Sequence, residues 1–224
     1  MSQLQNQSCV DRAIFDFAYN MALRDATMRA ASTGVSLDEL RQCGKARNVV
    51  RRYIDSILEG KPESFYEIEE NLEQAFGPLH RGKNKCFTFG NAQKLINMTA
   101  KYIYIGAYKD VSRRELFECC HCPMDTIIIQ RLINDVLKIR SQCRNALDAE
   151  TLDLFIDKCA RKITRGKRKG QLAWSSPTWS SITLKNCECY KHFQDAVSVC
   201  ARYHNPKLIP LEYDYVRFGQ FSSR

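Results

Sequence analysis

Apolar residues recur at intervals of three and four along most of this 224-residue chain, and no stretch alternates apolar and polar side chains convincingly. The three-and-four spacing places apolar side chains on one face of an α-helix, whereas a half-buried strand requires alternation. Glycine, proline and capping residues separate the periodic segments. The sequence therefore predicts a mainly α fold, a single domain over residues 1–224 built as a compact bundle of about eight helices.

Recognisable residues mark the ends of several predicted helices. The apolar positions of the first predicted helix are Val10, Ile14, Phe17 and Met21. The second begins at a capping box, in which Ser36 and Glu39 each satisfy a backbone donor of the other residue. We expect an interruption in it at Gly44 and an end at Gly60. A third helix is expected to carry Pro62 in its first turn, where proline is tolerated.

The central stretch, residues 87–132, joins two predicted helices that carry chemically distinct polar residues. The helix over residues 88–105 places Lys94, Asn97 and Lys101 opposite its apolar face. The next helix opens at Pro123, and its first amides and dipole favour the anionic form of Asp125. Lys94 and Asp125 could form a catalytic pair. Alternatively, Lys94 is a solvated surface residue and Asp125 a helix cap, and the sequence leaves both interpretations open.

A lysine–aspartate pair has a defined chemistry. A lysine amine can attack C1′ of a nucleotide sugar and form a Schiff base when a packed environment leaves some of it neutral. An aspartate nearby can activate the amine and stabilise the positive charge that develops on the sugar. The chain has no G-x-x-x-x-G-K-[ST], G-x-S-x-G or H-E-x-x-H motif, which argues against the enzyme classes with those local signatures.

The eleven cysteines are odd in number, and the N-terminus resembles no signal peptide. We therefore expect reduced thiols that pack as small apolar side chains. Residues 119–122, Cys-Cys-His-Cys, are too dense to wrap a tetrahedral ion, and the chain lacks the two cysteine knuckles of a zinc ribbon. We expect no metal and no cofactor.

The net charge of +9 is unevenly distributed, because residues 161–170 carry six positive charges and no acid. This basic run is either a solvated connector between helices or a contact surface for phosphates. The predicted contacts are Arg165, Lys167, Arg168 and Lys169. A second basic stretch contains Arg81, Lys83 and Lys85. DNA is thus the expected partner, and no apolar run is long enough for a membrane helix, so we expect a cytoplasmic protein.

The spacing Gly90-x-x-x-Lys94-x-x-Asn97, followed by Asp125 in Met-Asp-Thr-Ile-Ile, resembles the helix-hairpin-helix DNA glycosylases. The separation of 31 residues from Lys94 to Asp125 is more similar to the divergent 8-oxoguanine glycosylase branch than to the shorter bacterial endonuclease branch. The resemblance implies a two-lobed helical fold, a flipped base, and cleavage of the N-glycosidic bond with or without lyase activity. It assigns catalysis to Lys94 and Asp125, and DNA contacts to Gly90, Asn97 and Lys101.

Two departures and one alternative accompany this resemblance. Residues 88–91 read Thr-Phe-Gly-Asn where the superfamily hairpin has P-G-[IV]-G, and the four-cysteine iron–sulfur pattern of some relatives is absent. The block His-Cys-Pro-Met-Asp at residues 121–125 is also similar to uncharacterised bacterial proteins with Q-K-x-x-N and H-C-P-x-D segments, which implies no activity.

Three functions remain open from the sequence. The first is a DNA repair glycosylase in which Trp179 stacks on the flipped base. The second is a non-catalytic helical protein that binds nucleic acid through its basic stretches. The third is a module that binds another protein, with the basic run as a solvated loop.

Overall fold

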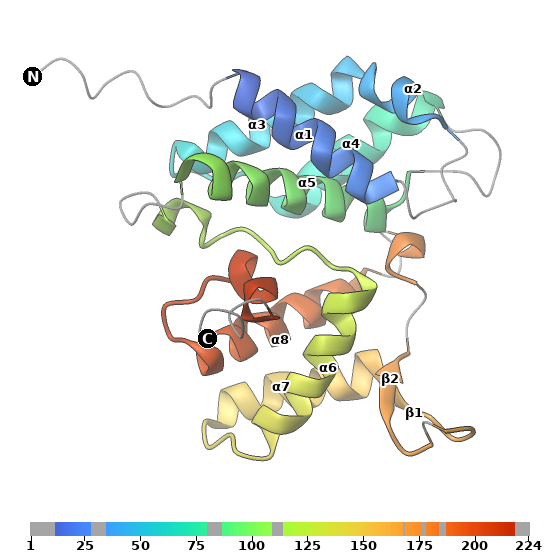
Figure 1. Cartoon of the computed structure of the whole chain (residues 1–224), viewed down its shortest axis with the longest axis vertical. Helices are drawn as coiled ribbons and strands as arrows, with labels where there is room; N and C mark the ends of the chain where they lie inside the picture. The colour runs from blue at the N-terminus through green and yellow to red at the C-terminus, as the bar shows by residue number, and fades with distance from the viewer. Residues whose placement is uncertain are drawn as a thin grey trace, which may run out of the picture. The chain divides into compact units, whose positions relative to one another are not determined.

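A computed structural model describes residues 12–27, 35–79, 87–108, 114–167, 169–175, 178–183 and 187–217. The fold is mainly helical, which confirms the predicted class (Figure 1). The chain divides into two compact units, Met1–Cys120 and His121–Arg224, and each is described by itself. The single domain expected from the sequence therefore stays a prediction.

The first unit is helical throughout its described part. Its elements are α1 (Arg12–Thr27), α2 (Leu37–Arg41), α3 (Gly44–Leu58), α4 (Phe65–Phe76), η1 (Gly77–Leu79), α5 (Phe89–Ile103), the π-helix η2 (Tyr104–Tyr108) and η3 (Arg114–Phe117). Helix α5 is central, because α1, α3 and α4 all pack against it. Figure 1 shows α1 and α5 crossing within this unit.

Helix α1 forms where the sequence predicts it, but it buries a different face. Phe17 is 64% exposed and Ile14 is 37% exposed. The buried positions are Phe15, Ala18, Tyr19, Ala22, Leu23 and Ala26. These residues also recur at intervals of three and four, and three of them are alanines, whose small side chains let α1 lie close to α5. The prediction that the larger apolar residues, such as Ile14 and Phe17, form the buried face of this helix is therefore wrong.

The capping signals locate the next helices well. Ser36 and Glu39 form the predicted capping box at the start of α2. The expected interruption is real, since α2 ends at Arg41 and α3 begins at Gly44. Gly60 follows α3 with φ +71°, a backbone conformation that favours glycine. Helix α4 begins at Phe65, so the prediction that Pro62 lies in its first turn is wrong.

The second unit combines three long helices with one small sheet. Its elements are α6 (Thr126–Arg140), α7 (Ala146–Cys159), β1 (Ala160–Lys162), β2 (Leu172–Trp174), η4 (Trp179–Ser181), α8 (Glu188–His204) and η6 (Pro210–Arg217). Helix α8 packs against α6, α7 and η6. In the part of the chain that is described, no helix is long and apolar enough to span a bilayer.

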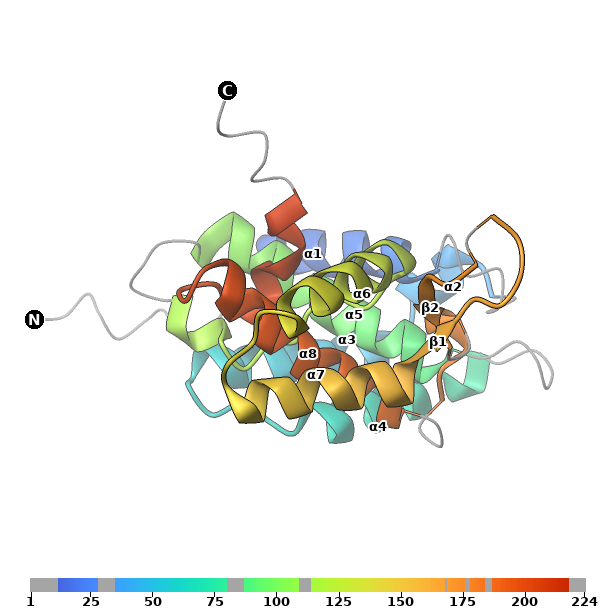
Figure 2. The same ribbon diagram turned by 90° about the horizontal axis from the view of Figure 1, so that it is seen from below.

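The sheet is an antiparallel hairpin formed by the basic run, where no strand was predicted. Ala160 pairs with Trp174, and Lys162 pairs with Leu172. Strands of three residues are too short to show a recognisable alternation, which explains the missed prediction. Figure 1 and Figure 2 both show the loop between β1 and β2 extending away from α7.

Candidate functional site

Lys94 lies on α5, a helix whose start is well defined by its N-terminal residues. Thr88 is the N-cap and forms a capping box with Asn91, in which each side chain accepts a backbone N–H of the other residue at 3.2 Å. The Asn91 amide also donates to the carbonyl oxygen of Ala26 at 2.8 Å, which ties α5 to the end of α1. These bonds fix the position of the first turn of α5.

The polar stripe of α5 is buried, so the alternative interpretation of Lys94 as a solvated surface residue is wrong. Lys94 is 6% exposed, Asn97 1% and Lys101 5%. The Asn97 amide donates to the Gln93 side chain at 3.3 Å, and Gln93 in turn donates to the Gly90 carbonyl at 3.0 Å. The sequence could not show this burial, because it depends on segments that are distant along the chain.

Gly90 lies in the first turn of α5. It is the second residue of α5, has helical backbone and is buried. A hairpin glycine that anchors a DNA backbone needs exposed amides, whereas Gly90 bonds within the first turn through its carbonyl oxygen. That Gly90 contacts DNA stays a prediction.

Asp125 is the N-cap of α6, which agrees with the interpretation of this residue as a helix cap. Its Oδ1 accepts hydrogen bonds from the backbone amides of Ile127 and Ile128, both at 2.9 Å. These bonds satisfy two of the donors that a helix leaves unpaired at its start. Since Lys94 and Asp125 belong to different units, their pairing stays a prediction.

The segment that precedes Asp125 is anchored to α8. The side-chain amide of Gln194 accepts from the backbone N–H of Cys122 at 3.0 Å and donates to its carbonyl at 2.8 Å. The Nδ1 atom of His121 lies 3.1 Å from the hydroxyl of Tyr190. Burial lowers the pKa of His121 from 6.5 to about 4, because the charged imidazolium loses its hydration. No residue spacing indicates these long-range contacts in advance.

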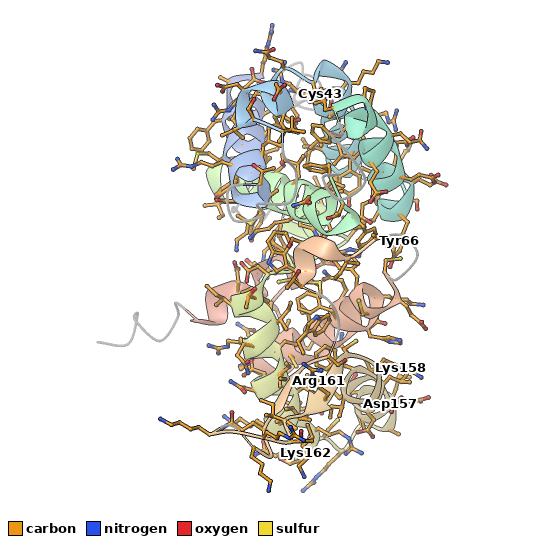
Figure 3. The ribbon with its side chains drawn as sticks, turned by 90° about the vertical axis from the view of Figure 1, so that its right-hand side faces the viewer. Cys43, Tyr66, Asp157, Lys158, Arg161 and Lys162 are labelled. Carbon is orange, nitrogen blue, oxygen red and sulfur yellow. The ribbon has the colours of Figure 1, made fainter. Side chains whose placement is uncertain are left out.

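The basic hairpin presents its charges to solvent. Arg161 and Lys162 extend from β1 (Figure 3), and both are exposed. The remaining exposed cations of its described part are Arg165, Lys167 and Lys169. Within the described residues, none of the five forms an ion pair. Arg168 lies outside the described residues, as do Arg81, Lys83 and Lys85.

Two glycines shape the loop of this hairpin. Gly166 has φ +78° and Gly170 has φ +89°, and these conformations are strained for any residue with a side chain. The Gly170 amide donates to the Ile163 carbonyl, and the Ile163 amide donates to the Gln171 carbonyl, both at 2.8 Å. The loop is thus held by backbone bonds, which leaves its lysine and arginine side chains available to solvent.

Trp179 does not offer an exposed ring. It begins η4 and is only 7% exposed. A flipped base needs an accessible aromatic face, so Trp179 could stack on a base only after a local rearrangement. The other tryptophan, Trp174, lies in β2, is partly buried and lies near the ring of Phe155 at 6.3 Å between centroids.

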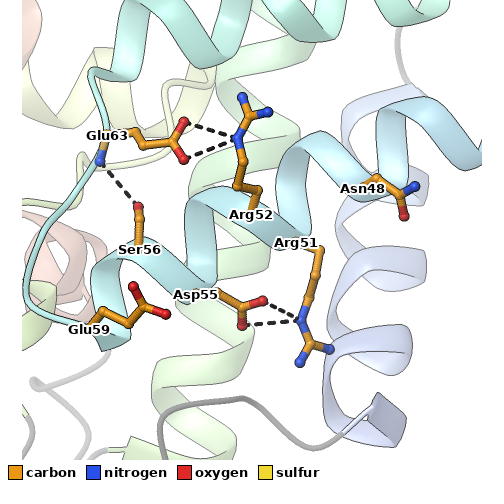
Figure 4. Close-up of a pocket in the computed structure, with 7 residues that line it drawn as sticks. All are labelled: Asn48, Arg51, Arg52, Asp55, Ser56, Glu59 and Glu63. Carbon is orange, nitrogen blue, oxygen red and sulfur yellow. Dashed lines mark hydrogen bonds and ion pairs between the residues drawn. The ribbon is translucent and has the colours of Figure 1, made fainter.

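Sequence reasoning missed a surface pocket formed by α3 and the segment between α3 and α4. Its lining residues are Asn48, Arg51, Arg52, Asp55, Ser56, Glu59 and Glu63 (Figure 4). Arg51 is paired with Asp55 at 2.9 Å and Arg52 with Glu63 at 3.0 Å. The four-residue spacing of Arg51 and Asp55 could have indicated the first pair. Because these charges compensate each other, the pocket indicates no particular ligand.

Asp135 forms a second polar cluster that the sequence did not reveal. Its Oδ2 accepts from the Tyr213 hydroxyl at 2.7 Å and lies 2.9 Å from His204 Nε2 and 3.3 Å from Arg131 Nε. Burial and the nearby carboxylate raise the pKa of Tyr213. These contacts join α6, α8 and η6, so the cluster serves the packing of this unit.

Neither a metal site among the described residues nor a similar protein indicates a function. Among the described residues, no group of three or more histidine, cysteine, aspartate or glutamate side chains could hold a metal ion. Comparisons of the chain with protein-family models, with curated proteins and with solved structures find no match. The function is therefore inferred from the residues of the chain itself.

Proposed function

We propose that this protein binds nucleic acid through the basic hairpin, residues 160–174. The observation that carries the proposal is the set of five exposed cations, which have no acidic partner among the described residues. Each lysine or arginine that contacts a phosphate releases condensed counterions, so such a surface favours polyanions at low salt. A two-stranded ribbon is also narrow enough to enter the major groove of a duplex.

The proposal is tested by the salt dependence of binding to a fluorescent duplex, measured by anisotropy. We compare the full-length protein with a variant in which Arg165, Lys167 and Lys169 are changed to glutamine. The matched control changes Lys61, Lys138 and Lys191 to glutamine. These three lysines are also exposed and lie outside the hairpin, so both variants lose three positive charges.

The hairpin variant should bind at least about tenfold more weakly at moderate salt, and its slope of log K against log salt should fall by about two to three. The control should keep most of the affinity and the slope. Equal losses in the two variants would show that net charge alone drives binding. A flat salt dependence in the unmodified protein would exclude phosphate contacts and favour the protein-interaction alternative.

The second candidate function is base excision, with Lys94 as nucleophile and Asp125 as acid/base. The observation that favours it is the burial of Lys94, since an amine removed from water is more readily neutral and nucleophilic. Asp125 adds a carboxylate that two helix amides orient. A base-excision enzyme would also need the phosphate-binding surface proposed above.

Borohydride trapping on duplexes with an abasic site or 8-oxoguanine tests this candidate. A covalent adduct should form, disappear in Lys94→Ala, and persist in Lys61→Ala, a control that removes an exposed lysine of the same unit. Asp125→Asn should retain the cap, because its amide oxygen can still accept both N–H groups, and should lose turnover. The absence of both adduct and base release across damaged duplexes would reject the candidate.

A further inference from the structure

The two faces of the basic hairpin differ in what they contact. Directly opposed residues of an antiparallel pair project to the same face, and successive residues of a strand alternate between faces. Trp174 pairs with Ala160, and the next pair is Ala173 with Arg161, so Trp174 and Arg161 lie on opposite faces. The Trp174 ring lies 6.3 Å from the ring of Phe155 in α7, measured between centroids. The Trp174 face is therefore the inner face of the ribbon, and the Arg161 face is the outer one.

The outer face leaves the side chain of Arg161 open to solvent. Arg161 is exposed and extends from β1 (Figure 3). Its cross-strand partner Ala173 carries only a methyl group, so no bulky side chain lies opposite the guanidinium. Ile163, two residues further along the chain, is half-buried. The outer face thus combines a planar cation with five N–H donors and neighbours that are small or apolar.

A bulge ends the ladder at the loop. The Gly170 amide donates to the Ile163 carbonyl and the Ile163 amide donates to the Gln171 carbonyl, so two residues oppose one. Gly170 has φ +89°, as the first residue of a glycine bulge requires. Bulges of this kind pin the register of a ribbon. The register that places Arg161 on the outer face is therefore fixed by the chain itself.

Different nucleic acids make different demands on such a ribbon. Sequence-tolerant binding of single strands depends on aromatic rings on which bases stack, and the only aromatic residue of the hairpin is Trp174, on the inner face. The major groove of an A-form RNA duplex is too deep and narrow for side chains to read. The major groove of B-form DNA is about 12 Å wide and admits two strands that lie about 5 Å apart. Duplex DNA therefore fits the hairpin best.

We propose that the hairpin enters the major groove of B-form DNA with its outer face towards the bases, and that Arg161 reads guanine. This inference deepens the proposed function and rests on it. A guanidinium presents paired donors that match N7 and O6 of guanine, the commonest specific contact in this groove. The exposed loop cations Arg165, Lys167 and Lys169 contact phosphates, which supply affinity but carry no sequence information. Arg161 is thus the residue that determines specificity.

Binding of the full-length protein to three fluorescent probes of equal length tests the class of nucleic acid. The probes are a DNA duplex, an RNA duplex of the same sequence and one strand of the DNA, compared by anisotropy at the same salt concentration. The DNA duplex should bind at least about tenfold more tightly than either of the others. Equal affinity for the three probes would overturn the proposal and leave phosphate binding by the hairpin intact. The absence of binding to all three would reject the proposed function as well.

Selection from a library of DNA duplexes with a randomised centre tests the contact with guanine. The full-length protein should enrich a sequence that has guanine at a fixed position. Arg161→Lys keeps the positive charge but cannot form the bidentate contact. This variant should bind the selected sequence about tenfold more weakly and lose the preference for guanine, with the same slope of log K against log salt. Arg165→Lys is the matched control in the loop and should keep both affinity and preference.

A change in the DNA tests the same contact without a protein variant. Replacing the selected guanine by 7-deazaguanine removes the N7 acceptor and should weaken binding of the unmodified protein by a similar factor. Circular dichroism verifies that both lysine variants are folded. A library that enriches no sequence, or an Arg161→Lys variant that keeps the preference for guanine, would overturn the proposal. Neither result affects the comparison of glutamine variants on which the proposed function depends.

Discussion

At the scale of single residues, the positions that matter most are polar groups in buried surroundings. Lys94 and Asn97 have little exposure, and Gln194 holds both backbone groups of Cys122. A buried polar group that loses its partner costs about 1–3 kcal/mol, so such contacts select one arrangement of the chain. Charge or polarity in the sequence indicates the groups, but only the fold shows that they are buried.

His121 should make stability depend on pH. The pKa of His121 in the folded chain is about 4, below its ordinary value of 6.5. Between pH 4 and pH 6.5 the unfolded chain therefore binds more protons than the folded chain. The stabilisation is therefore present above pH 6.5 and is lost as the pH falls towards 4, by on the order of 2 kcal/mol. Urea unfolding followed by tryptophan fluorescence measures this loss, and His121→Gln should remove most of it. An identical pH profile in the variant would contradict the assignment.

At the scale of secondary structure, capping residues proved more informative than apolar stripes. The boxes at Ser36 and Thr88 and the cap at Asp125 begin helices in the structure. Their bonds lie within a few residues, so the sequence alone determines them. The buried face of α1 depends on what α5 presents, and two stripes of α1 satisfy the same periodicity. The hairpin was missed because each strand has only three residues.

The hairpin loop should be sensitive to its two glycines with positive φ. Gly166→Ala and Gly170→Ala add a methyl group into open space, so the cost is backbone strain of about 1 kcal/mol each. Hydrogen exchange at the Ile163 amide should accelerate about fivefold in each variant. Gly44→Ala is the control, because Gly44 also has open space but begins α3 without a positive φ. Unchanged exchange in both loop variants would refute the strain argument.

At the scale of the whole chain, the two compact units contribute unequally to the spectroscopic signals. Both tryptophans, Trp174 and Trp179, belong to the second unit, whereas helices of both units contribute to circular dichroism. Fluorescence therefore reports on the second unit, and circular dichroism reports on both. The sequence predicted the helical class but gave no composition shift or linker that would separate the units.

Core substitutions should reveal whether the units unfold separately. Leu72→Ala in α4 and Leu152→Ala in α7 each truncate a fully buried leucine, at a cost of about 2–5 kcal/mol to the unit that contains it. Leu72→Ala should lower the urea midpoint seen by circular dichroism more than that seen by fluorescence. Leu152→Ala should lower the fluorescence midpoint. Equal shifts in both signals for both variants would instead establish one cooperative domain.

The basic hairpin also determines where a protease should meet the folded chain. Trypsin cleaves after lysine and arginine, and Arg165, Lys167 and Lys169 are exposed in a loop that only a short ladder supports. Exposed loop tips of this kind are preferred sites of nicking. A bound polyanion would cover the same peptide bonds. Comparing the cleavage pattern with and without nucleic acid thus shows which residues of the loop are protected, whereas a binding curve gives only the overall affinity.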